Sequence, residues 1–133
     1  MIWAKVFVVF FVTHQFGDYL LQTEWQAMTK QNGLGSDPNA RRALFSHTFT
    51  YSLAYVPAFI WIAQTWLGWR TLWIAAVVIL PHLIQDDRRL LGYYMRRVKG
   101  MDPTANWTVA ALVDQAAHMV ALFGAALLVS ALS

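Results

Sequence analysis

The sequence contains no cysteine and few charged residues. Charged side chains make up 13% of its 133 residues, about half of the roughly 25% that is usual for soluble domains. Without cysteine, the chain cannot form a disulfide-stabilised scaffold, a thiol redox centre or a zinc site with thiolate ligands. The low charge also excludes a disordered tail and argues against an ordinary cytosolic domain, because too little polar surface remains to face water.

Apolar residues dominate instead, at 58% of the chain, and they fall into four long runs. Because about 20 helical residues cross the hydrocarbon part of a bilayer, these runs predict an all-α, polytopic membrane protein. We expect a single domain, an antiparallel bundle of four transmembrane helices. The polar segment after the first run should hold a short interfacial helix around Trp25. The expected spans cover residues 2–22, 44–68, 71–90 and 107–132.

The basic residues are unevenly distributed between the two ends of this expected bundle. Only Lys5 and Arg70 belong to the end that carries both termini, and the other eight lie at the end that holds the two long connections. The positive-inside rule therefore predicts cytoplasmic long loops and both termini outside. Membrane lipids are the expected partners and a homo-oligomer stays open, whereas no nucleic-acid partner is expected because no nucleic-acid-binding motif accompanies the basic residues. The eight are Lys30, Arg41, Arg42, Arg88, Arg89, Arg96, Arg97 and Lys99.

All four histidines lie inside the expected spans, one in each. Three of them have an aspartate four residues away, and residues four apart share one face of a helix. An aspartate near the bilayer centre costs about 3 kcal/mol even on a lenient insertion scale, so these groups need a cation or a wet cavity. Counted from the span ends, all of them fall in the cytoplasmic half of the bundle, and we predict that they converge. The candidate metal ligands are His14, Asp18, His47, His82, Asp86, Asp114 and His118.

Imidazole and carboxylate ligands without thiolate suit zinc, manganese or iron. Seven candidates exceed the four ligands of a tetrahedral zinc ion. We therefore expect one or two divalent metal ions, zinc first and manganese or iron as alternatives. With a single ion, the remaining acids would hydrogen-bond to the ligating histidines. Two other interpretations stay open: a set of interhelical hydrogen bonds or a proton path, and two b-type haems with the four histidines as axial ligands.

The residues around these candidates resemble those of a known family. The matching stretches run from His14 to Trp25, from Ser46 to His47, from His82 to Asp86 and from Asp114 to His118. In this order they resemble the DUF3307 family (domain of unknown function 3307). The resemblance implies a small bacterial integral membrane protein, here of the inner membrane, and supplies no established reaction. The pattern is more distantly similar to membrane-bound metal-dependent hydrolases, whose histidines and aspartates also lie at helix ends.

The pattern favours a metal-dependent hydrolase at the cytoplasmic face of the membrane. A metal-activated water would attack the phosphoryl or acyl group of a lipid or lipid-linked substrate. Asp87 is the candidate general base, and Arg88 and Arg89 are candidates for binding a substrate phosphate. The simpler interpretations of these three residues are a solvated charge and two cytoplasmic anchors. The alternative functions are a non-enzymatic protein that transports or handles metal ions or protons, and a bis-histidine cytochrome.

Overall fold

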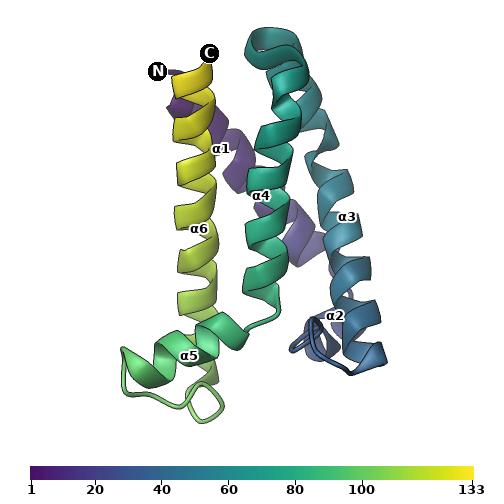
Figure 1. Cartoon of the computed structure of the whole chain (residues 1–133), viewed down its shortest axis with the longest axis vertical. Helices are drawn as coiled ribbons and strands as arrows, with labels where there is room; N and C mark the ends of the chain where they lie inside the picture. The colour runs from purple at the N-terminus through teal and green to yellow at the C-terminus, as the bar shows by residue number, and fades with distance from the viewer.

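The computed structural model describes residues 1–133, and it contains helices but no strands. Four long helices alternate in direction, so that both termini lie at one end of the bundle (Figure 1). Two short helices lie at the opposite end, where α5 runs across the bundle (Figure 1). The predicted all-α class is therefore confirmed. The long helices are α1 (Ile2–Gln15), α3 (Pro38–Ile62), α4 (Thr71–Asp86) and α6 (Trp107–Leu132), and the short ones are α2 (Glu24–Thr29) and α5 (Arg89–Arg97).

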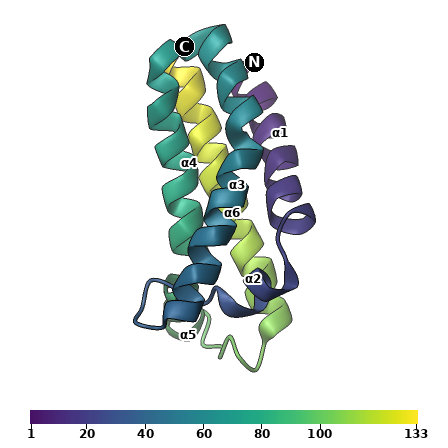
Figure 2. The ribbon, with the colours of Figure 1, turned by 90° about the vertical axis from the view of Figure 1, so that its right-hand side faces the viewer.

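Each long helix packs against two others. α1 contacts α3 and α6, and α4 contacts the same two helices, so the four close into a ring. Figure 2 shows α1 and α4 on opposite sides of the bundle with α3 and α6 between them. Side chains that point inward from all four helices therefore share one interior.

The short helix α2 forms where the sequence predicts a helix around Trp25. Thr23 and Gln26 make a capping box: the Thr23 hydroxyl accepts a hydrogen bond from the Gln26 N–H (3.2 Å), and Gln26 Oε1 accepts one from the Thr23 N–H (2.9 Å). This reciprocal pair fixes the first turn of a helix. The Gln26 amide also donates to Ser46 Oγ at 3.1 Å, which attaches α2 to α3.

The turn between α3 and α4 lies where Gly68 interrupts the apolar sequence. A π-helical turn, Ala63–Leu67, and a 3-10 turn, Gly68–Arg70, reverse the chain between the two helices. Gly68 has a φ of 54°, a conformation that glycine adopts without the steric penalty that a side chain brings.

The third apolar run does not continue as one helix into the basic segment that follows it. α4 ends at Asp86, and α5 begins only at Arg89. Arg88 between them is left-handed, with a φ of 61°. Asp87 anchors this break, because its carboxylate accepts a hydrogen bond from the Leu34 N–H (2.7 Å) and its carbonyl accepts one from the Asn32 N–H (2.9 Å). The loop before α3 therefore holds the end of α4, and α5 turns away from the bundle axis.

The interior of the bundle has an apolar half and a polar half. Near the termini, the core consists of buried apolar and tyrosine side chains such as Phe10, Ile62, Val78 and Val129. In the other half, all four histidines are buried, as are the aspartates paired with them. The polar interior therefore lies toward α2 and α5.

Two helical stretches are long and apolar enough to cross a membrane. Pro38–Asp86 has 49 residues and a mean hydropathy of 1.6, and Trp107–Leu132 has 26 residues and a mean hydropathy of 1.7. The first stretch contains α3, the turn at Gly68 and α4. This finding supports membrane association coarsely, and the four spans and the sides of the loops stay predictions.

Candidate metal centre

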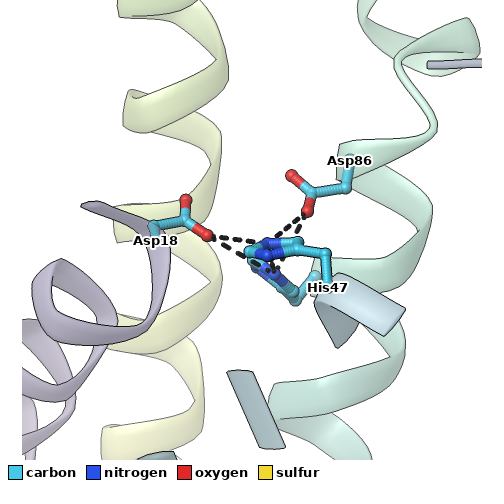
Figure 3. Close-up of side chains that lie close together, drawn as sticks. Asp18, His47 and Asp86 are labelled. Carbon is cyan, nitrogen blue, oxygen red and sulfur yellow. Dashed lines mark hydrogen bonds and ion pairs between the residues drawn. The ribbon is translucent and has the colours of Figure 1, made fainter. Parts of the chain in front are cut away.

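Four of the predicted ligands meet in the polar half of the bundle. Asp18 lies in a π-helical turn, Phe16–Leu20, that extends α1; His47 comes from α3, and His82 and Asp86 come from the last turns of α4. All four are buried. One ligand atom from each lies within 4.8 Å of those of the other three. Figure 3 shows Asp18 and Asp86 on opposite sides of His47, with their carboxylates turned toward its ring.

Five of the six distances between these atoms are close to those of a tetrahedral ligand cage. His47 Nε2 lies 3.1 Å from Asp18 Oδ1 and 2.9 Å from Asp86 Oδ2. His82 Nε2 lies 3.2 Å from Asp86 Oδ2, 3.6 Å from Asp18 Oδ1 and 3.2 Å from His47 Nε2. Two ligands that each lie about 2.0–2.1 Å from a tetrahedral zinc ion are about 3.3–3.4 Å apart. The group can therefore hold a metal ion, with two nitrogen and two oxygen ligands.

Tyr51 positions the His82 ring. The two rings are stacked, with centroids 3.5 Å apart and planes within 4° of each other. Gly17 lies close to the Tyr51 ring, since a Cβ added at Gly17 would lie 2.8 Å from Tyr51 Cδ2. The π-helical turn around Gly17 thus brings the backbone close to Tyr51 and carries Asp18 to the centre, as π-turns at functional sites often do.

Lys30 places one positive charge beside Asp86, although the sequence predicts it only as a basic residue of a loop. It is 4% exposed, and its ammonium donates to Asp86 Oδ2 at 2.7 Å and to Gln22 Oε1 at 2.5 Å. A buried charge requires such a partner. The one signal that could have located Lys30 is the Thr23/Gln26 capping box, which places this residue directly after a one-and-a-half-turn helix.

The other three predicted ligands lie beside the central four. His14 Nε2 is 3.5 Å from Asp18 Oδ2, and His118 Nε2 is 3.7 Å from Asp86 Oδ1. Asp114 is farther out, with its Oδ2 3.5 Å from an Arg88 guanidinium nitrogen. A ligand role for His14, Asp114 and His118 stays a prediction.

Asp87, Arg88 and Arg89 have different surroundings. Both carboxylate oxygens of Asp87 already accept hydrogen bonds, Oδ1 from the Leu34 N–H (2.7 Å) and Oδ2 from Arg89 Nε (2.5 Å). The Arg89 side chain is about half exposed, and it pairs with Asp87. Arg88, by contrast, is partly buried and reaches Asp114. Of the three, Arg88 is the one whose side chain approaches the cluster.

One cavity adjoins the centre at Asp18, and a second lies near it. The smaller has a volume of about 160 Å³ and a mostly polar lining that includes Asp18, Lys30, Arg88 and Gln115. The larger, of about 710 Å³, is mostly apolar and lies between α5 and α6. Asp114 lines both. The polar cavity and the apolar cavity therefore share one carboxylate in their linings.

The fold and site define a class: an all-helical protein with a buried group of two histidines and two aspartates that can hold a metal ion. Residues 6–133 match the family model described as "Protein of unknown function (DUF3307)". The chain therefore belongs to the DUF3307 family. No curated protein and no solved structure matches it.

Proposed function

We propose that this protein is a four-span membrane hydrolase that uses a divalent metal ion to cleave a phosphate or ester bond of a lipid or lipid-linked substrate at the cytoplasmic face. The observation that carries the proposal is the convergence of Asp18, His47, His82 and Asp86 next to a polar cavity lined by two cationic side chains. Zinc is the first expectation for the metal, since five of the six distances between ligand atoms are close to tetrahedral spacing.

The distribution of polar and apolar side chains supports the membrane location. The histidines are at most 2% exposed, whereas large apolar side chains on all four long helices are more than half exposed. Water disfavours an apolar surface of this extent, but lipid tails favour it, and intramembrane ionisable groups characteristically face a bundle interior. The exposed apolar residues include Val8, Phe49, Leu53, Leu72, Leu80, Leu112 and Val120.

The chain offers separate places for the two parts of an amphiphilic substrate. Lys30 and Arg88 line the small polar cavity on the Asp18 side of the cluster, where two positive charges suit an anionic phosphate. The neighbouring cavity of about 710 Å³, lined mostly by apolar residues of α5 and α6, suits an acyl or isoprenoid chain. A divalent ion bound at the cluster would supply a Lewis acid and an activated water.

A non-enzymatic role in handling protons or metal ions has one observation in its favour. His14 Nδ1, Tyr51 and Tyr55 are hydrogen-bonded in sequence, at 3.1 Å for each step, and they extend from the cluster toward the outer half. This chain ends at the Phe10 carbonyl, which accepts from the Tyr55 hydroxyl at 2.9 Å. A complete path would have to continue through apolar core, so the hydrolase is the better-supported proposal.

The cytochrome alternative has less support. The four histidine rings form one cluster, with neighbouring centroids about 5 Å apart, such as 4.9 Å for His82 and His118 and 5.1 Å for His14 and His118. The cavity beside Asp18 has a volume of about 160 Å³, and none of the four histidines lines it. Two porphyrins would require these rings to separate.

The test is phosphate release from lipid substrates. Protein in mild detergent, loaded with Zn²⁺ or Mn²⁺, is incubated with phosphatidic acid, phosphatidylglycerol phosphate and an isoprenoid diphosphate, and free phosphate is measured. We expect release from at least one of them, abolished in His82→Ala and retained in Val78→Ala, which shortens a buried side chain one turn earlier on α4. Metal-loaded wild type that leaves these phosphates and a matching set of lipid esters intact would contradict the hydrolase.

A further inference from the structure

We infer that the centre has a second metal position, formed by His14, His118 and the outer oxygens of Asp18 and Asp86, so that the two carboxylates bridge two ions. This inference rests on metal binding at the first position, which is part of the proposed function. It assigns a ligand atom to each residue, and five observations carry it.

The two carboxylates each present one oxygen to either side. Asp18 Oδ1 and Asp86 Oδ2 face His47 and His82. On the other side, Asp18 Oδ2 lies 3.5 Å from His14 Nε2, and Asp86 Oδ1 lies 3.7 Å from His118 Nε2. Each aspartate therefore lies between two imidazole nitrogens, as a bridging carboxylate does in a dinuclear centre.

His118 presents a free lone pair toward this second position. Its Nδ1 lies 2.8 Å from the Asp114 carbonyl, which can only accept, so Nδ1 carries the hydrogen. In the neutral ring Nε2 is then unprotonated. Nε2 is buried without a hydrogen-bond partner, and so is Asp86 Oδ1, which it faces. Two buried acceptors that face each other need a cation between them, and a histidine fixed by a backbone carbonyl is a common metal ligand.

His14 is fixed in the same tautomer by a longer chain of hydrogen bonds. The Phe10 carbonyl takes the Tyr55 hydroxyl hydrogen, and Tyr55 accepts that of Tyr51. The Tyr51 oxygen can therefore only accept from His14, so His14 Nδ1 is the donor and Nε2 has the lone pair. The two tyrosines in the apolar core thus have a purpose: they hold the His14 ring in a ligating form.

Acceptors surround His14 Nε2. Besides Asp18 Oδ2, the amide oxygen of Gln115 lies 3.0 Å from it. The Gln115 NH₂ group donates to Asp18 Oδ2 at 3.4 Å, and this contact keeps the amide oxygen turned toward the histidine. Gln115 Oε1 is therefore a further oxygen ligand available to the second ion.

The distances from the two histidines to the carboxylates favour an ion over a proton as the bridge, whereas the 3.0 Å contact between His14 Nε2 and Gln115 Oε1 has the length of a hydrogen bond. A hydrogen bond between nitrogen and oxygen spans about 2.7–3.2 Å, and the contacts of 3.5 Å and 3.7 Å exceed that range. Nitrogen and oxygen ligands on the same ion, each about 2.0–2.2 Å from it, lie roughly 3–4 Å apart, depending on the angle between them. The second position is thus spaced for metal ligands.

Titration of the metal-free protein with Mn²⁺ tests the second position. Bound manganese is counted by mass spectrometry, and electron paramagnetic resonance reports whether the ions are magnetically coupled. We expect two equivalents per chain with an exchange-coupled spectrum, and one uncoupled equivalent in His118→Ala. Leu122→Val, one turn farther along α6, should keep both ions. X-ray absorption of the wild type should show a metal–metal distance of about 3.5–4 Å, a result that needs no variant.

The outcomes separate the two levels of the proposal. One uncoupled equivalent in the wild type, lost in His82→Ala, would overturn the second position and leave the first. Two equivalents retained in His118→Ala would remove His118 from the second position and overturn the assignment. Failure of the wild type to bind any Mn²⁺ or Zn²⁺ would overturn the proposed function together with this inference.

Discussion

Lys30 is buried in the centre, although a lysine in a loop is expected to be exposed. A lysine in a polar loop is normally solvated, but here its ammonium lies 2.7 Å from Asp86 Oδ2 and is almost fully buried. The Lys30 ammonium therefore compensates part of the negative charge of the centre. A metal ion and this ammonium compensate the same carboxylate.

Replacing Lys30 tests that shared role. In Lys30→Met, the metal-free protein should lose about 3–5 kcal/mol, because one partner of a buried pair has been removed. Metal affinity should rise at least about tenfold, since a repelling charge is gone. Thermal unfolding in detergent, with chelator and with Zn²⁺, measures both the stability and the effect of bound metal. The loss of stability in Lys30→Met should be large with chelator and small with Zn²⁺. Equal losses under the two conditions would show that Lys30 only supports the fold.

At the scale of single elements, the π-helical turn after α1 decides where Asp18 lies. The spacing of four predicts that Asp18 shares a helix face with His14, and the two side chains do lie 3.5 Å apart. The turn Phe16–Leu20 also brings Gly17 against Tyr51, and Asp18 reaches His47 on α3. This one turn therefore contacts Tyr51, which stacks on His82, and also carries Asp18 to the centre.

A methyl group on Gly17 should disturb this connection without removing a ligand. In Gly17→Ala, the new Cβ would meet Tyr51 at 2.8 Å, and the resulting overpacking should cost about 1–3 kcal/mol and weaken metal binding. Gly124→Ala on α6 is the matched control, because a Cβ there meets nothing within 4 Å and should be neutral or slightly stabilising. Unfolding temperature and zinc affinity are measured for both variants. Unchanged zinc affinity in Gly17→Ala would show that the turn does not position the centre.

The sequence predicts the helices better than it predicts how they are joined at the site. The long apolar runs predict the all-α class. The His/Asp spacing of four places each pair on one helix face, so the convergence of Asp18, His47, His82 and Asp86 could be predicted as well. The π-turn has no pattern beyond Gly17. The left-handed Arg88 that ends α4 depends on hydrogen bonds from the distant loop to Asp87. Such features arise from tertiary contacts, which local spacing does not encode.

The whole molecule has polar groups in its interior and apolar groups on its surface, which is the reverse of the usual arrangement in a water-soluble protein. Polar groups are concentrated inside one half of the bundle, apolar groups cover its outside, and eight basic residues lie toward the α2 and α5 end. The proposed membrane location would explain all three features, and it would place the centre close to the cytoplasmic headgroups. A substrate could then reach the polar cavity from the membrane surface while its chain stays in an apolar environment.

The absence of cysteine makes this topology simple to test. Single cysteines introduced by Ser36→Cys, Thr104→Cys and Ser133→Cys would each be the one thiol in the chain, and all three positions are exposed. With an impermeant maleimide applied to cells whose outer membrane is permeabilised, we expect Ser133→Cys to be labelled directly. Ser36→Cys and Thr104→Cys should react only after the inner membrane is broken. The reverse pattern would invert the orientation, and labelling of all three from outside would contradict the four spans.

The metal content of the purified protein tests the central claim most directly. Protein is extracted in mild detergent with neither added metal nor chelator, and its bound metals are counted by mass spectrometry, beside His82→Ala and Val78→Ala. The account predicts at least one equivalent of zinc, manganese or iron in the wild type and in Val78→Ala, and its loss in His82→Ala. A wild type without stoichiometric metal, even after reloading with each of these ions, would contradict it and leave Asp18, His47, His82 and Asp86 as a hydrogen-bonded link between helices.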